Sequence, residues 1–402
     1  MTTSRIAKRL SRVKPSPSSA AQDRANALRR AGKDIVNLVI GEPDFDTPAH
    51  IRRAAIEAIE RGDTRYTASA GTLPLREAIA AKFQRENGLT YSPKDIIVTI
   101  GAKHAIYNAL SVTLEPGDEV IVPAPYWVSY TDMTLACEGE PVVVQCSEDD
   151  GFKLTAKALE AAITPKTRWL ILNSPNNPTG ASYSSADLRA LADVLLRHPN
   201  VMVMTDDIYE HIRFDTDENP HIAVIEPELK SRTLVINGVS KTYAMTGWRI
   251  GWAAGPADLI DALNMLQSQS VSNAASISQA AAVAALNGDQ SLVTEWKNTY
   301  KQRRDAGLKI INSIPGLSCR TPGGAFYLFV NCSGMMGRTT PEGKKLETDT
   351  DVVMYLLEGV GVGLIAGAAY GVSPYFRMSI AASVETIEEG CRRIAQAVAA
   401  LK

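Results

Sequence analysis

Between residues 96 and 254 the chain alternates short apolar runs with segments of helical periodicity, and this alternation constrains the fold more than any other feature. Runs of this length and continuity, rich in Val and Ile, are typical of strands buried on both faces rather than of amphipathic helices. Helical patterns, such as 102–114 and 184–197, lie between most of them. The alternation predicts an α/β fold with a mainly parallel sheet and right-handed crossovers. The seven runs cover 96–100, 119–122, 142–145, 169–172, 201–204, 233–236 and 248–253.

After about residue 285 the sequence changes character. Helical and strand-like segments surround a polar loop, at 295–308, 325–330, 333–349, 376–380 and 386–401. They predict a small α+β domain over 286–402, beside a large domain over 48–285 that holds a mainly parallel seven-stranded sheet. We expect residues 1–47 to form an N-terminal arm and part of the small domain.

Length and composition set wider limits. A chain of 402 residues can form two domains, and 45% apolar with 21% charged residues is ordinary for a globular enzyme. A net charge of −2 gives no reason to expect nucleic acid or a membrane surface as partner, and no apolar run approaches the roughly 20 residues that span a bilayer. The five cysteines are scattered without a CxxC pair. We therefore expect no metal site, no disulfide framework and a reducing cytoplasm.

Polar residues follow five of the expected strands. In open parallel sheets, ligands bind at the carboxyl ends of the strands. Ordinary turns would be richer in Gly, Ser and Lys and poorer in Trp, Tyr and Asn than these segments are. We therefore predict a binding site at this edge of the sheet, formed by 101–103, Trp127, 173–177, 206–209 and 240–241.

The segment 238–251, Gly-Val-Ser-Lys-Thr-Tyr-Ala-Met-Thr-Gly-Trp-Arg-Ile-Gly, has the clearest chemistry. Lys241 stands at the end of an apolar run, where desolvation favours the neutral amine that a Schiff base needs. Arg249, beside glycines, can clamp a phosphate with two parallel hydrogen bonds. An aldehyde and a phosphate are the two ends of pyridoxal phosphate (PLP). A solvated surface lysine and a packing Gly-Trp pair are the simpler alternatives, so the rest of the site has to agree.

This segment resembles the cofactor-lysine signature of the class-I aminotransferases. The likeness runs from about Lys14 to the C-terminus and is similar to the bacterial aspartate and prephenate aminotransferase subgroup of fold-type I. It includes Gly-Glu-Pro-Asp-Phe-Asp-Thr-Pro at 41–48, Pro-Tyr-Trp-Val-Ser-Tyr at 125–130 and Asn-Pro-Thr-Gly at 177–180. The resemblance implies a fold-type I PLP-dependent transferase that forms a homodimer with shared active sites.

The resemblance also implies roles for individual residues. Lys241 would carry PLP and act as acid and base, Asp206 would keep the ring nitrogen protonated, and Tyr209 would donate to the phenolic oxygen. A helix cap at Asp206 and a core aromatic at Trp127 are the structural alternatives. The implied cofactor-binding set is completed by Gly101, Ala102, Lys103, Trp127, Asn177, Ser240, Arg249 and, from the neighbouring subunit, Tyr66.

Arg377 stands in the apolar run 374–380, where a buried arginine requires a partner. That partner is either a protein carboxylate or the α-carboxylate of an amino acid, and the resemblance favours the substrate. Ile40 stands where the family has a small residue, which would narrow the pocket. The implied substrate-binding set is completed by Gly41, Trp127, Asn177, Lys103, Lys14 and Ser18, the last three for a distal carboxylate.

The implied reaction is transamination between L-aspartate and 2-oxoglutarate, giving oxaloacetate and L-glutamate. Prephenate, aromatic or other amino-acid transamination on the same fold stays open, as does a PLP lyase. A PLP-sensing regulator would need a DNA-binding module, which the early start of the pattern disfavours. The first 22 residues are basic and serine-rich like a transit peptide, but we interpret them as the N-terminal arm. We expect a cytoplasmic homodimer that acts on amino acids and 2-oxo acids.

Overall fold

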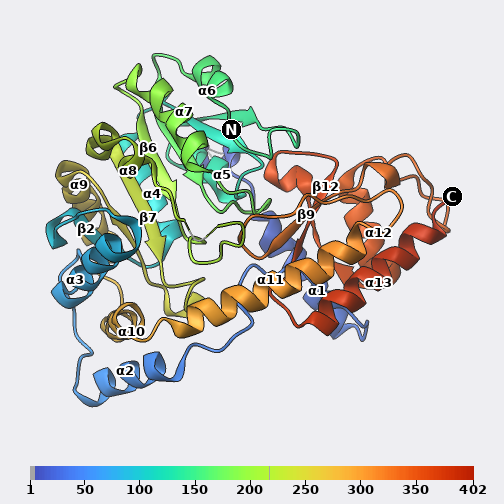
Figure 1. Ribbon diagram of the computed structural model, residues 1–402, viewed down its shortest axis with the longest axis horizontal. Helices are drawn as coiled ribbons and strands as arrows, with labels where there is room; N and C mark the ends of the chain where they lie inside the picture. Colours follow the sequence, from blue (N-terminus) through green and yellow to red (C-terminus); the bar gives the residue numbers. More distant parts are fainter. Residues whose placement is uncertain (1–4, 217) are drawn as a thin grey trace.

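The computed structural model describes residues 5–216 and 218–402, and its main feature is a seven-stranded sheet (Figure 1). The strands are β2 (Ile96–Thr99), β3 (Glu119–Ala124), β4 (Glu140–Gln145), β5 (Thr167–Asn173), β6 (Met202–Asp206), β7 (Thr233–Gly238) and β8 (Gly251–Ala254). Their spatial order is β2-β8-β7-β6-β5-β3-β4. All neighbours are parallel except β8, which runs antiparallel to both β2 and β7. The expected α/β fold with a mainly parallel seven-stranded sheet is confirmed.

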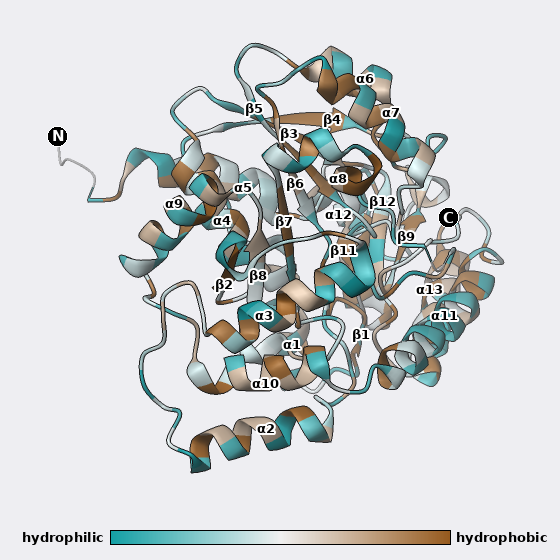
Figure 2. Cartoon of the chain, turned by 60° about the vertical axis from the view of Figure 1, so that its left-hand side comes forward, coloured by the Kyte–Doolittle hydropathy of each residue, from teal (hydrophilic) through white to brown (hydrophobic). Residues whose placement is uncertain are grey.

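Helices cover both faces of this sheet, so its central strands are buried on both sides. They are α4 (Ala102–Thr113), α5 (Ser129–Ala136), α6 (Ala156–Ala162), α7 (Ser185–Leu196), α8 (Ile222–Ile225) and α9 (Ala257–Ser268). In β5, Trp169 and Ile171 pack in the same apolar cluster as α4 and α9, whereas Leu170 and Leu172 pack with α7. Figure 2 shows the hydrophobic strands at the centre and hydrophilic residues on the outer helices. Two covered faces explain the continuous apolar runs.

Two details of the expected strands are wrong. The run 248–253 is not one strand, because Thr246–Trp248 form a 3-10 turn and β8 begins only at Gly251. Arg249 between them is left-handed, with φ +55°, which is incompatible with an extended strand. The second detail is β4, whose residues are exposed or half-buried rather than covered on both faces, since it is the last strand of the sheet.

A second sheet, antiparallel, has the order β11-β12-β9 and contains β9 (Tyr327–Asn331), β11 (Ile365–Ala366) and β12 (Tyr375–Ser379). It lies beside α11 (Ser291–Ile311), α12 (Asp349–Val360) and α13 (Val384–Ala400), as Figure 1 shows. The strand-like runs and the two long helices expected here are present. The sequence analysis missed α12, although Thr348 and Asp351 form a capping box at its start.

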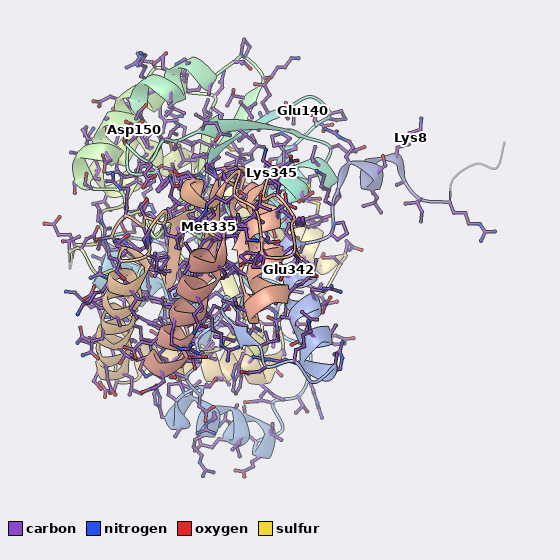
Figure 3. The ribbon with its side chains drawn as sticks, turned by 90° about the vertical axis from the view of Figure 1, so that its right-hand side faces the viewer. Lys8, Glu140, Asp150, Met335, Glu342 and Lys345 are labelled. Carbon is purple, nitrogen blue, oxygen red and sulfur yellow. The ribbon has the colours of Figure 1, made fainter. Side chains whose placement is uncertain are left out.

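The N-terminal segment contacts both parts of the fold. Its first turn, Lys8–Arg12, packs against α5, whereas β1 (Val36–Asn37) pairs in parallel with β10 (Val362–Gly363) to form a separate two-stranded sheet. Before β1 lies an unexpected helix, α1 (Pro17–Arg30), in which proline occupies the first turn, a position that its fixed φ favours. Further towards the N-terminus the chain extends from the body, with Lys8 on the extension (Figure 3).

Three further helices lie at one end of the large sheet, where α10 (Ser276–Asn287) packs against both α2 (Ala49–Glu60) and α3 (Leu73–Lys82). Their shared apolar cluster includes Ile51, Ile79 and Ala282. Within residues 5–216 and 218–402, none of the helices has both the length and the apolar character that crossing a bilayer requires.

Candidate active site

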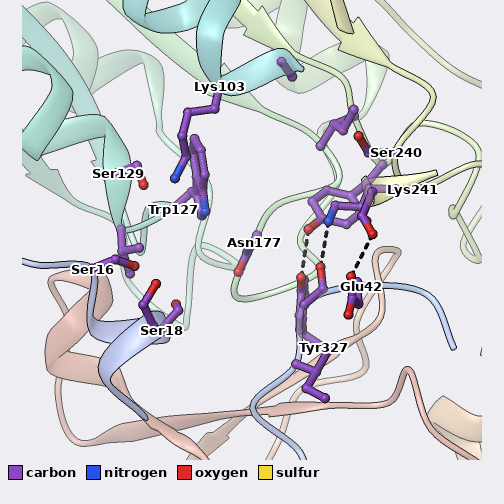
Figure 4. A pocket seen from close by; sticks show the side chains of 18 of the residues that line it. Ser16, Ser18, Glu42, Lys103, Trp127, Ser129, Asn177, Ser240, Lys241 and Tyr327 are labelled. Carbon is purple, nitrogen blue, oxygen red and sulfur yellow. Dashed lines mark hydrogen bonds between the residues drawn. The ribbon is translucent and has the colours of Figure 1, made fainter. Parts of the chain in front are cut away.

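The carboxyl ends of the central strands open into a pocket of about 630 Å³ that the second sheet and the N-terminal segment close from the other side (Figure 4). The pocket lies between the large sheet and the second sheet, and its walls bring together residues that are far apart in the sequence. The predicted residues that line it are Ser18, Gly41, Ala102, Lys103, Trp127, Asn177, Asp206, Tyr209, Ser240, Lys241, Arg249 and Arg377.

Lys241 stands just after β7 and points its amine into the pocket. Its Nζ donates to the carbonyl oxygen of Gly41 at 2.7 Å. Burial lowers the pKa of Lys241 to about 8, and the positive charges of Arg377 and Arg249 act in the same direction, against Glu42. A larger share of the neutral amine is therefore present near neutral pH than in an ordinary lysine.

Asp206 ends β6 and has one bonded and one unbonded carboxylate oxygen. Its Oδ2 accepts a hydrogen bond from the hydroxyl of Tyr130 at 2.6 Å. Its Oδ1 is buried and has no partner within residues 5–216 and 218–402. Burial raises the pKa of Asp206 to about 6, while the bond from Tyr130 lowers it. An unpaired buried carboxylate oxygen is costly, so the site is suited to a ligand that brings its own N–H.

Arg249 lies where helix α4 begins. A Cβ placed on Gly101, the residue before α4, would lie 2.5 Å from Nη2 of Arg249. Gly101 also has φ +109°, a conformation that side chains disfavour. The glycine therefore leaves room for the guanidinium beside the first backbone N–H groups of the helix. Such a combination of a cation and a helix N-terminus is suited to bind a phosphate.

Arg377 is buried in β12 without a carboxylate partner among the residues that the structure describes. Its Nη1 donates to Oδ1 of Asn177 at 3.0 Å and its Nη2 to the carbonyl oxygen of Val39 at 2.6 Å. Its Nε has no hydrogen-bond partner in that part of the chain. The rings of Tyr327 and Tyr370 lie 4.3 and 5.4 Å from its guanidinium carbon. The sequence leaves two possible partners open for Arg377, and the first of them, a protein carboxylate, is not present among the described residues.

Tyr209 and Tyr327 share a hydrogen bond between their hydroxyl oxygens at 2.8 Å. Burial raises the pKa of both phenols, that of Tyr209 well above its ordinary value. Both phenols therefore keep their protons at neutral pH.

Lys103 lies over the ring of Trp127, with 4.8 Å between Nζ and the ring centroid (Figure 4). Burial lowers the pKa of Lys103, and Arg249 adds to the effect. Ser16 and Ser18, at the start of α1, line the pocket near this pair. This side of the pocket therefore combines a cation with hydroxyl groups.

Three predicted residues do not line the pocket. Gly101 lies behind Arg249, as described. Lys14 uses its backbone N–H to bind Asp132 at 2.9 Å and is absent from the pocket wall. Tyr66 is 90% exposed and lies away from the pocket of its own chain.

The sequence analysis assigned no individual role to four residues of the site: Glu42, Tyr130, Asn173 and Tyr327. The first three belong to motifs that it quoted or to the asparagine-rich run after β5, but their partners could not be read from the sequence. Asn173 donates from Nδ2 to the backbone carbonyl of Asp206 at 2.8 Å. Tyr327 lies in a run interpreted only as an apolar strand, so no motif singled it out.

The chain is similar to known proteins in sequence and in structure. Residues 33–394 match the family described as aminotransferase class I and II. A relative from Rhizobium meliloti named aspartate aminotransferase is 54% identical over 93% of this chain and 91% of its own. The aspartate/prephenate aminotransferase of Cereibacter sphaeroides is 51% identical over 96% of each chain.

Solved structures are similar over the whole chain. The aspartate aminotransferase of Rhizobium meliloti matches with a TM-score of 0.97 and 52% identity, covering 100% of both chains. That of Thermus thermophilus, solved with maleate, matches with a TM-score of 0.92 and 38% identity, over 98% of this chain and 100% of its own.

Proposed function

Because the chain belongs to the class I and II aminotransferases, we propose that it transfers the amino group of L-aspartate to 2-oxoglutarate. It is a PLP-dependent enzyme that works on an amino acid and a 2-oxo acid. The observation that carries the choice of substrate is a pair of cations in one pocket. Within residues 5–216 and 218–402, neither Arg377 nor Lys103 forms an ion pair with a carboxylate. A substrate with two carboxylates supplies both missing charges.

The polar groups of the pocket fit PLP. The unpaired Oδ1 of Asp206 suits a ring N–H, Arg249 and the start of α4 suit the phosphate, and the amine of Lys241 suits the aldehyde. When bound, PLP supplies an aldehyde that reacts with amines and a ring that withdraws electrons from the substrate Cα. We propose that Trp127 packs against the ring and that Ser240 and Asn177 complete its hydrogen bonds.

Proton transfer is the task of Lys241. With a pKa lowered to about 8, its amine can both accept and return a proton near neutral pH. We propose that Nζ takes the proton from the substrate Cα once the amino acid occupies the pocket. Asp206 stays ionised opposite the ring N–H, which keeps that nitrogen protonated, and Tyr130 holds the carboxylate in place.

Substrate orientation follows from the two cations. Arg377 is held by Asn177 and Val39 and can turn its remaining donors to the α-carboxylate. Lys103, with Ser18 nearby, is then available to the distal carboxylate. A relative solved with maleate, a four-carbon dicarboxylate, supports this assignment.

Prephenate is the second candidate. It carries two carboxylates as aspartate does, so Arg377 and Lys103 would serve it equally. Several relatives, including the one from Cereibacter sphaeroides, are named aspartate/prephenate aminotransferase. The order of preference between these substrates depends on the shape of the pocket near Ile40, which lines it.

We also propose a homodimer in the cytoplasm. The exposed ring of Tyr66 supports the role implied by the resemblance, contact with the phosphate bound by the neighbouring subunit. The five cysteines are all free thiols, as suits a reducing compartment. The division into an arm and small-domain part (1–47), a large domain (48–285) and a small domain (286–402) is part of the same proposal.

A half-reaction tests the proposed function. The PLP-loaded protein is mixed with one amino acid and no acceptor, and the visible absorption of the cofactor is followed. We expect L-aspartate and L-glutamate to change the spectrum, and L-alanine and L-phenylalanine to have little effect. The Lys241→Ala variant should show no conversion. Conversion by L-phenylalanine alone would contradict the dicarboxylate assignment, and release of ammonia would indicate a lyase. Prephenate is then offered as acceptor to the aminated enzyme.

A further inference from the structure

Tyr327 points from β9 into the pocket, where it contacts both Arg377 and Tyr209 (Figure 4). Its ring lies against Arg377 and its hydroxyl meets the hydroxyl of Tyr209. We propose that Tyr327 is a positioning residue with two separable parts: the ring supports the arginine that binds the substrate carboxylate, and the hydroxyl directs the proton of Tyr209 to the cofactor. This inference rests on the proposed function, and it concerns a residue to which the resemblance assigns no role.

The ring acts on a guanidinium that lacks a counter-charge. The centroid of Tyr327 lies 4.3 Å from Cζ of Arg377, closer than that of Tyr370 at 5.4 Å. The negative face of an aromatic ring stabilises a buried cation without neutralising it. A protein carboxylate in this place would compete with the substrate for Arg377, whereas a ring does not. The ring therefore keeps the arginine both buried and available.

The hydroxyl of Tyr327 can act as the donor of the hydrogen bond that it shares with Tyr209. Tyr209 and Tyr327 each carry one proton, but the 2.8 Å contact between their oxygens uses only one of them. If Tyr327 donates, the proton of Tyr209 remains available for an acceptor in the pocket. A hydroxyl that accepts one bond also becomes a better donor of the next. Tyr327 thus prepares Tyr209 to donate to the phenolic oxygen of PLP.

Gly41 leaves the space that this arrangement needs. A Cβ on Gly41 would lie 2.9 Å from the hydroxyl oxygen of Tyr327 and 3.9 Å from Nη1 of Arg377. The carbonyl oxygen of the same glycine accepts the hydrogen bond of Lys241. Any side chain at this position would push Tyr327 away from Tyr209.

Tyr327→Phe separates the two parts, because it keeps the ring and removes the hydroxyl. The first readout is the pH at which the visible spectrum of bound PLP changes, measured without substrate. We expect the midpoint to rise by roughly 0.2 to 0.5 pH unit, since neighbouring hydrogen bonds strengthen one another by about 10–30% and a weaker Tyr209 bond stabilises the protonated form. KM for L-aspartate should stay within about twofold, because the ring still supports Arg377.

Tyr327→Leu removes the ring as well. It should raise the midpoint as Tyr327→Phe does and raise KM for L-aspartate by a further 5- to 30-fold or so. Tyr370→Phe is the matched control. Its ring also contacts Arg377, but no hydrogen bond joins its hydroxyl to Tyr209 among the described residues, so the midpoint should stay at the parent value.

The role of the Tyr327 hydroxyl and the role of the Tyr327 ring can each be disproved without the other. An unchanged midpoint in Tyr327→Phe overturns the role of the hydroxyl. A large rise in KM in the same variant overturns the role of the ring. A parent protein that binds PLP but converts no amino acid would instead contradict the proposed function, and the substrate-free titration would still test Tyr327.

Discussion

Tyr130 donates its hydroxyl proton to Oδ2 of Asp206 at 2.6 Å, while Oδ1 of the same carboxylate is buried without a partner in residues 5–216 and 218–402. The bond fixes the plane of the carboxylate, because Oδ2 can no longer turn into the pocket. Oδ1 is left free for the ring N–H that we propose it binds. A tyrosine 76 positions away in the sequence thus determines which oxygen of Asp206 stays available to a ligand.

Substitutions at Asp206 and Tyr130 distinguish the effect of the carboxylate charge from the effect of the carboxylate orientation. Asp206→Asn should lower kcat by about 10²- to 10³-fold, because an amide cannot keep the ring nitrogen protonated. Tyr130→Phe should lower kcat only about tenfold, since the carboxylate remains but loses its fixed plane. Steady-state kinetics with L-aspartate compare the two. Equal losses in both variants would contradict a purely orienting role for Tyr130.

The pKa of Lys241 makes the stability of the cofactor-free protein depend on pH. Burial lowers that pKa from 10.5 to about 8, so between these values the unfolded chain binds more protons than the folded one and stability rises with pH. At pH 7 the folded state bears a penalty of up to about 3 kcal/mol. Lys241→Met should therefore be more stable than the parent at pH 7.

Thermal unfolding of both proteins without PLP, at pH 7, 8, 9 and 10, checks this prediction. The difference in melting temperature should shrink as the pH approaches 10.5, the pKa of an ordinary lysine, because deprotonating the parent amine then costs progressively less free energy. A difference in melting temperature that stays constant with pH would show that burial of the Lys241 charge does not destabilise the folded protein.

Much of this site could be predicted because the sheet itself assembles it. Asp206 ends β6 and Lys241 follows the neighbouring parallel strand β7, so the sheet brings both residues to the same edge. Arg377 was recognisable as a charge in an apolar strand. The contacts that cross between the two sheets, such as Tyr327 with Tyr209, could not be predicted, because no periodicity relates residues 118 positions apart.

Other gaps have different causes. The helix α1 was not predicted, because its residues are mostly polar and only Ala25 is buried. Tyr66 does not contact the pocket of its own chain, so its implied role needs a second subunit and stays a prediction. Lys14 stays one as well, since here only its backbone forms the contact with Asp132.

Gly101→Ala should weaken cofactor binding. The new Cβ would displace Arg249 from its place beside the start of α4, and the phosphate would lose a charge-assisted hydrogen bond. We expect the Kd for PLP to rise about 10- to 100-fold. Equilibrium titration of the cofactor-free protein by absorbance measures it.

Gly117→Ala is the matched control for this substitution. Gly117 has φ +97°, close to that of Gly101, but a Cβ there would meet nothing within 4 Å. It imposes similar backbone strain far from the site, so stability should fall while Kd is unchanged. If both variants bind PLP equally, the position of Arg249 does not depend on Gly101.

Arg377→Ala should act on substrate binding. It removes the charge that we assign to the α-carboxylate, so KM for L-aspartate should rise about 10²-fold. The control is Arg304→Ala, which removes another buried arginine, one that binds the carbonyl oxygen of Pro322 and does not line the pocket. The control should lose stability with KM unchanged. An equal KM in parent and Arg377→Ala would exclude the carboxylate role.

Behind the pocket wall, Glu210 forms a buried network that joins α3 to the strand before Lys241. Its carboxylate forms an ion pair with Lys82 and accepts hydrogen bonds from Asn87 at 2.7 Å, Asn219 at 2.8 Å and Asn237 at 2.5 Å. Burial opposes the charge, but Lys82 and His211 lower the pKa of Glu210 well below its ordinary value. Both members of the ion pair are 2% exposed or less.

Removing one charge of this pair should cost more than removing both. Glu210→Gln keeps the shape of the side chain but leaves the buried Lys82 with only the longer ion pair to Glu86, at 3.6 Å, so unfolding free energy should fall by about 3 kcal/mol. The double variant Lys82→Met/Glu210→Gln buries no charge and should recover at least half of that loss. Denaturant unfolding of the parent, both single variants and the double variant completes the cycle. A double variant less stable than Glu210→Gln would mean that the network stabilises the fold through its hydrogen bonds rather than by pairing charges.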